Sequence, residues 1–101
     1  MIIELKGFIY AIEKKKVISD NLTLQNVIIT IDSDKAMPQN IIGEVRNERM
    51  VMLDVLKVGD EVNARAFLNG HEHNGRHFVT LTIFDICLRY FVEGARVTPK
   101  T

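Results

Sequence analysis

Apolar and polar residues alternate along much of this 101-residue chain, a pattern that predicts β-strands with one buried face. Residues 2–12 alternate imperfectly around Gly7, and a glycine inside a strand indicates a sharp bend or a bulge. Residues 22–32 are rich in β-branched side chains. Residues 40–46 form a shorter strand that follows Pro38, a residue suited to the start of a strand. The first half of the chain therefore predicts three strands.

The segments around these strands are polar or helical. Residues 13–21 join a lysine run to a Ser-Asp-Asn turn cluster, so they are predicted to be a polar loop. Asn47 is the predicted N-cap of a helix of two to three turns that ends before Gly59. An apolar stripe at helical spacing consists of Met50, Leu53 and Leu56. We expect this stripe to cover one end of the sheet.

The strongest turn signal is Asn74-Gly75, because a two-residue type I′ turn needs positive φ at both positions. A uniform register from this turn places an aliphatic set on one side of a hairpin, predicted to be buried: Val62, Ala66, Leu68, Leu81, Ile83 and Cys87. The other side is polar and aromatic, and it pairs His71 with Phe78, Asn69 with Thr80, Phe67 with Thr82, and Arg65 with Phe84. Such a two-faced ribbon is expected to curl around a core.

The predicted order is three strands, one helix and two strands. This is the order of the OB-fold, a five-stranded Greek-key barrel, although a split αβ sandwich can use similar elements. The fold class is therefore predicted to be mainly β, with one short helix between strands 3 and 4. We expect one OB-fold domain over residues 1–92 and a short C-terminal tail over residues 93–101.

Composition gives no global charge signature, because 13 Lys and Arg balance 13 Asp and Glu. An electrostatic partner must therefore be recognised by local clustering. The single cysteine, Cys87, excludes an intrachain disulfide and is expected to be a buried thiol in a reducing compartment. No signal peptide or membrane-length apolar run is present, so a cytoplasmic protein without membrane contact is expected.

Catalytic and metal-binding patterns are weak. His71, His73 and His77 are close in sequence, but the hairpin register turns His77 to the opposite face, so no metal site is expected. The sequence shows no nucleophile elbow, phosphate-cradling loop or conspicuous pair of carboxylates. These observations favour a protein that is not an enzyme and needs no cofactor.

The run at residues 56–62, with Asn74-Gly75-Arg76 and Phe78, resembles a family of small stand-alone bacterial proteins of unknown function related to single-stranded-DNA-binding OB-folds. Gly7 and Pro38 match that family's mid-strand glycine and its proline-led third strand. The chain departs from the family at three positions where the family usually carries aromatic residues: Gly43, Arg46 and His77. The resemblance covers most of residues 2–86 and implies an OB-fold related to single-stranded-DNA-binding proteins.

In an OB-fold, a ligand lies across the second and third strands, between the first loop and the last hairpin. The residues that would meet there are basic or histidine side chains: Lys14, Lys15, Lys16, Lys35, Arg46, His71, His73, Arg76 and His77. The rings expected to stack on bases are Tyr10, Phe67 and Phe78, and Phe8 is a further possible stacking ring. Clustered positive charge and stacking rings favour binding of single-stranded nucleic acid, with DNA preferred.

A second hypothesis is a protein-assembly module. If the inward sets above are correct, an outward apolar patch remains on the second and third strands, formed by Leu24, Ile28 and Ile42. This patch, or residues 90–92, would join copies into a homodimer or a larger homo-oligomer. The two hypotheses differ in salt dependence, because strand binding weakens with salt and an apolar interface does not.

Overall fold

We describe a computed structural model of the chain over residues 1–32, 35–93 and 96–99, with side chains through Arg89. Within these ranges the elements, in chain order, are β1 (Ile2–Ile12), β2 (Lys16–Ser19), β3 (Leu22–Ile31), β4 (Gln39–Arg46), the 3₁₀ helix η1 (Asn47–Leu53), β5 (Glu61–His73), β6 (Arg76–Leu88), β7 (Tyr90–Glu93) and β8 (Arg96–Pro99). In the described part of the chain, no helix is long and apolar enough to cross a membrane.

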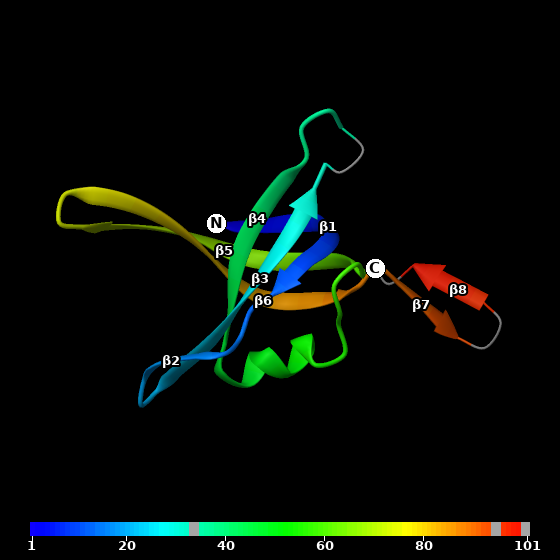
Figure 1. Ribbon diagram of the computed structural model, residues 1–101, viewed down its shortest axis with the longest axis horizontal. Coiled ribbons are helices and arrows are strands. Elements are labelled where there is room, and N and C mark those ends of the chain that lie inside the picture. Colours follow the sequence, from blue (N-terminus) through cyan, green and yellow to red (C-terminus); the bar gives the residue numbers. More distant parts are fainter. Residues whose placement is uncertain (33–34, 94–95, 100–101) are drawn as a thin grey trace.

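Five of the strands close into a barrel, in the order β1-β5-β6-β4-β3, with β3 pairing back to β1 (Figure 1). All neighbours are antiparallel except β4 and β6, which share one parallel bridge between Glu44 and Thr82. The helix η1 lies between the third and fourth barrel strands, β4 and β5. The predicted five-stranded OB-fold with one short helix is confirmed.

Gly7 lies directly before Phe8, the residue at which β1 passes from one neighbour to the other. Residues of β1 up to Phe8 pair with β5, and those from Phe8 onward pair with β3. A Cβ built on Gly7 would lie 2.0 Å from the carbonyl oxygen of Thr30. The barrel therefore closes with backbone against backbone at a position that has no room for a side chain.

The hairpin of β5 and β6 has the predicted turn, with Asn74 and Gly75 both at positive φ. The predicted pairs hold from the turn to Ala66 opposite Ile83. A bulge at Phe84 then shifts the register by one residue, so Val62 faces Leu88 rather than the predicted Cys87. Because of this shift Ile86 is buried, while Cys87, predicted to be buried, is only half-buried.

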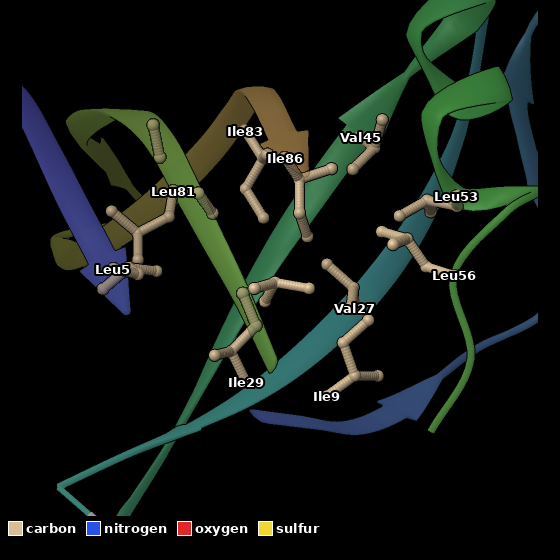
Figure 2. Packing of buried hydrophobic residues seen from close by; sticks show 13 residues of the cluster. Leu5, Ile9, Val27, Ile29, Val45, Leu53, Leu56, Leu81, Ile83 and Ile86 are labelled. Atoms are coloured by element: carbon tan, nitrogen blue, oxygen red, sulfur yellow. The ribbon is translucent and has the colours of Figure 1, made fainter. Parts of the chain in front are cut away.

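The core fills the barrel and reaches η1. Figure 2 shows Val27 of β3, Val45 of β4 and Ile83 of β6 among its side chains, with Leu53 and Leu56 beside them. Four of the six residues predicted as buried on the hairpin are buried, namely Val62, Ala66, Leu81 and Ile83. The other two predictions are wrong: Cys87 is half-buried, and Leu68 is 36% exposed, since it lies where the pairing of β5 with the start of the chain ends.

Two predictions about the first hairpin are also wrong. Residues 13–21 are not all loop, because β2 pairs with β3 from Lys16 to Ser19. Leu24 shares a face with Lys16 of β2 and Arg46 of β4, as its expected outward orientation requires, but it is buried rather than exposed. Side chains opposite one another in a sheet share a face, so the stems of these two cations flank Leu24 and cover it.

The helix begins differently from the prediction. Asn47 has a φ of 49° and is the first residue of η1, and the N-cap, Arg46, makes no side-chain capping bond. The Asn47 side chain instead accepts a 3.0 Å hydrogen bond from the backbone N–H of Thr23. Asn47 therefore ties η1 to the start of β3. The burial of the predicted apolar residues is confirmed, with Leu53 and Leu56 buried and Met50 packed against the core, but η1 ends at Leu53, so Leu56 lies beyond the helix.

Beyond the barrel, β7 and β8 pair with each other as a separate two-stranded sheet. The predicted division into a domain over residues 1–92 and a tail over residues 93–101 stays a prediction. The side chains of residues 90–92, which were candidates for an oligomer interface, lie outside those described.

Candidate nucleic-acid interface

Two hairpins project from the same side of the barrel (Figure 1). One is formed by β2 and the start of β3. The other, which we call the arm, is the outer part of β5 and β6 over residues 67–79, where every residue is exposed. In the strand order β6-β4-β3-β2, the outer surface of β4 and β3 lies between the two. This is the region where an OB-fold receives its ligand.

One side of the arm carries rings and cations in a row, and we call it the arm face. Its members alternate along β5 and face one another across the ribbon: Phe67, Asn69, His71 and His73 from β5, with Arg76, Phe78, Thr80 and Thr82 from β6. His71 stacks on Phe78, with ring centroids 5.8 Å apart and an interplanar angle of 23°. Phe67 and Phe78 are each 43% exposed, so both rings offer surface to a ligand.

The arm face continues onto the barrel through residues that the sequence prediction did not include in the site. The rings of Phe67 and Phe84 lie 4.6 Å apart, and the Arg65 guanidinium lies 5.2 Å from the Phe84 ring centroid. The predicted register already placed Arg65 and Phe84 on this face, which was the available signal. They remain in contact although the bulge at Phe84 brings Asp85, rather than Phe84, directly opposite Arg65.

The cation of Arg65 is only loosely held at this site. Its Nε lies 3.5 Å from an Asp85 oxygen, and both side chains are about half exposed. An exposed ion pair of this kind contributes about 0–1 kcal/mol. Arg65 can therefore exchange the carboxylate for a phosphate at little cost.

The lysine run lies at the base of the other hairpin. Lys14 and Lys15 are exposed between β1 and β2. Lys16 is in β2, with its Nζ 3.9 Å from a Glu13 oxygen. Lys14 and Lys15 form no ion pair with any described residue, so they are the freer charges of the run.

Arg46 ends β4 beside this hairpin, but its charge is largely neutralised. Its Nε donates a 2.8 Å hydrogen bond to Oε1 of Glu44, and a second guanidinium nitrogen donates to the same oxygen. The surface between the two hairpins is thus less positive than the sequence alone predicts.

Three of the predicted site residues lie apart from the arm face. Tyr10 stands eight residues along β1 from Ile2, the partner of Phe67, or about 26 Å along the strand. Lys35 lies in the segment between β3 and β4, which belongs to neither of the two projecting hairpins. His77 faces Glu72 on the other side of the arm, with a nitrogen–oxygen distance of 3.7 Å.

The histidines do not gather into a chelating set. Among the described residues, no three His, Cys, Asp or Glu side chains are grouped so that they could hold a metal ion. His71 is engaged with Phe78, and His73 faces Arg76 near the tip.

Solved structures share this architecture at low sequence identity. The mitochondrial single-stranded DNA-binding protein of S. cerevisiae has a TM-score of 0.73 and 17% identity, over 87% of this chain and 94% of that chain. The N-terminal domain of PriB from Thermoanaerobacter tencongensis, described as dimeric, has a TM-score of 0.66 and 16% identity, over 86% and 93%. A small single-stranded DNA-binding protein from Streptomyces coelicolor has a TM-score of 0.52 and 15% identity, over 87% and 91%. These likenesses show a shared OB-fold.

No curated protein matches the sequence. A family model does match, over residues 4–87, and its description is a domain of unknown function. The predicted resemblance to a family of unknown function, related to single-stranded-DNA-binding OB-folds, is confirmed. The chain therefore belongs to the DUF3127 family.

Proposed function

We propose that this protein binds single-stranded nucleic acid, with DNA preferred, and catalyses no reaction. The observation that carries the proposal is the arm face, where the stacked pair of His71 and Phe78 and the row Arg65–Phe84–Phe67 follow one side of a projecting ribbon. Bases stack on such rings with little regard to sequence, each ring contributing about 1–3 kcal/mol.

The charges near these rings suit the backbone of a single strand. Arg76 and His73 stand at the tip of the arm, Arg65 stands at its base, and Lys14 and Lys15 flank the surface between the hairpins. A strand that follows the arm face would meet cations at both ends of the ring row. Phosphate contacts of this kind make affinity depend on salt.

The comparisons support this proposal by analogy. Two of the structural neighbours, from S. cerevisiae and Streptomyces coelicolor, are single-stranded DNA-binding proteins. Fold likeness alone does not assign function, so the proposal depends on the side chains of the arm.

The test is the affinity of a fluorescent oligo-dT for Phe78→Ala and for Phe8→Ala. The two rings have similar exposure, 43% and 40%, but Phe8 lies on β1, opposite Glu61 and Thr30 and away from the arm. We expect Phe78→Ala to weaken binding by about 1–3 kcal/mol and Phe8→Ala to leave it unchanged. Equal effects from both variants would show that the arm is not the stacking site.

A second candidate function, self-assembly, is favoured by an apolar cleft of about 390 Å³ at the open end of the barrel. Its lining includes the exposed side chains of Ile42 and Val79, together with Leu68. The patch first expected for assembly is reduced, because Leu24 is buried and Ile28 is half-buried. A homodimer that persists at high salt in sedimentation, combined with no oligonucleotide binding, would favour assembly over strand binding.

A further inference from the structure

A small cavity opens where β4 and β6 separate. The two strands share a single bridge at Glu44 and Thr82, and on the arm side of that bridge they diverge. The cavity between them has a volume of about 130 Å³. A cavity of about 150 Å³ holds one benzene ring, so this space is the size of a single six-membered ring. Its walls include Asn26 of β3, Ile42 and Glu44 of β4, and Val79 and Thr80 of β6.

The polar wall of this cavity offers hydrogen-bond acceptors. Both donors from Arg46 reach Oε1 of Glu44, and no described donor reaches the other carboxylate oxygen. The Glu44 side chain is only 14% exposed. The Asn26 side-chain nitrogen donates a 3.2 Å hydrogen bond to Oε1 of Glu13. This bond fixes the orientation of the Asn26 amide and leaves the amide oxygen as an acceptor.

The charge of Glu44 does not exclude an anionic strand from this place. Arg46 neutralises the carboxylate, and the apolar side chains of Ile42 and Val79 stand beside it. The cavity therefore suits an uncharged ring with an amino group at its edge. A phosphate would meet unpaired oxygens there and is disfavoured.

We propose, on the basis of the proposed strand binding, that this cavity is a base-reading subsite that selects cytosine over thymine or uracil. Cytosine presents an N4 amino group, which can donate to Glu44 and Asn26, and its ring nitrogen can accept from the Thr80 hydroxyl. Thymine and uracil present a carbonyl oxygen at the same edge, which would face those acceptors.

The first experiment needs no variant. Wild-type protein is titrated with labelled oligo-dC, oligo-dT and an oligomer of N4-dimethylated cytosine, all of equal length and at one salt concentration. We expect oligo-dC to bind about tenfold more tightly than oligo-dT, within the range for a good contact to a base edge. The dimethylated oligomer keeps the ring and loses both amino hydrogens, so its affinity should fall to that of oligo-dT.

The second experiment compares Glu44→Gln with Glu48→Gln. Both substitutions remove one negative charge, but Glu48 is exposed on η1, away from the cavity. We expect the dC/dT affinity ratio to approach one in Glu44→Gln and to stay at the wild-type value in Glu48→Gln. Thermal unfolding of both variants checks that they are folded. If Glu44→Gln is not folded, the comparison of oligo-dC with the dimethylated oligomer on wild-type protein still tests the subsite.

The outcomes distinguish failure of the proposed subsite from failure of the proposed strand binding. Equal binding of dC and dT by wild-type protein, or a preference that survives Glu44→Gln, would overturn the subsite and leave strand binding intact. Absence of binding to any oligomer at low salt would overturn strand binding itself, and the subsite with it.

Discussion

At the scale of single residues, one glycine, Gly7, marks the place where the barrel brings two backbones together. Gly7 and Gly70 both lie inside strands, but their surroundings differ. A Cβ on Gly7 would meet the Thr30 backbone at 2.0 Å, whereas a Cβ on Gly70 would meet only the Phe78 carbonyl oxygen at 4.0 Å. Backbone cannot move aside as a flexible side chain can, so Gly7 is required by the closure of the barrel.

We therefore expect Gly7→Ala to lower the free energy of unfolding by at least about 1–3 kcal/mol, the usual cost of overpacking. Gly70→Ala serves as the matched control and should change stability by less than about 0.5 kcal/mol, like other surface substitutions. Urea unfolding followed by circular dichroism measures both. Equal stability of the two variants would contradict the close approach of β1 to β3.

At the scale of elements, the strands β5 and β6 belong to the barrel at one end and form the arm at the other. From Val62 to Ala66 the even-numbered residues of β5 are buried, and from Phe67 to His73 none is. The arm therefore contributes little burial to the core. The arm can therefore carry ligand-binding side chains without loss of folding stability.

This separation predicts the behaviour of a protein with a shortened arm. Asn69 and Thr80 are direct partners, so residues 70–79 can be replaced by Asn-Gly, which forms a two-residue turn between them. We expect this variant to keep its thermal unfolding midpoint within a few degrees of wild type. It should lose most of its affinity for single strands, since Phe78, His71 and Arg76 are removed. Unchanged affinity would place the binding surface elsewhere on the barrel.

The elements also show what the sequence could and could not predict. The turn at Asn74-Gly75 and the strand alternation depend on local chemistry, so the hairpin, the order of elements and most of the core were predictable. The bulge at Phe84 and the burial of Leu24 depend on the curvature of the closed barrel and on a neighbouring strand, neither of which alternation encodes. The spacing of Glu44 and Arg46 indicates that they can pair. It does not show that this pairing lowers the positive charge of the surface between the two hairpins.

At the scale of the whole molecule, a chain with balanced charge must bind a polyanion through uneven placement of its cations. Several cations are paired with acids in the described structure, including Lys16, Arg46 and Arg65. Lys14 and Lys15 have no ion-pair partner among the described residues and stand beside the surface between the two hairpins. We infer that these two lysines supply much of the salt-dependent part of binding.

The most direct test of strand binding is a titration of labelled oligo-dT across a series of salt concentrations, with the size of the protein measured on the same samples. We expect binding at low salt that weakens steeply as salt rises. In Lys14→Ala/Lys15→Ala the slope of log affinity against log salt should fall by about 1.4, at about 0.7 per phosphate contact. Lys6→Ala/Lys57→Ala removes the same charge from other exposed positions and should keep the wild-type slope. Absence of binding at the lowest salt, or affinity that does not change with salt, would contradict the account.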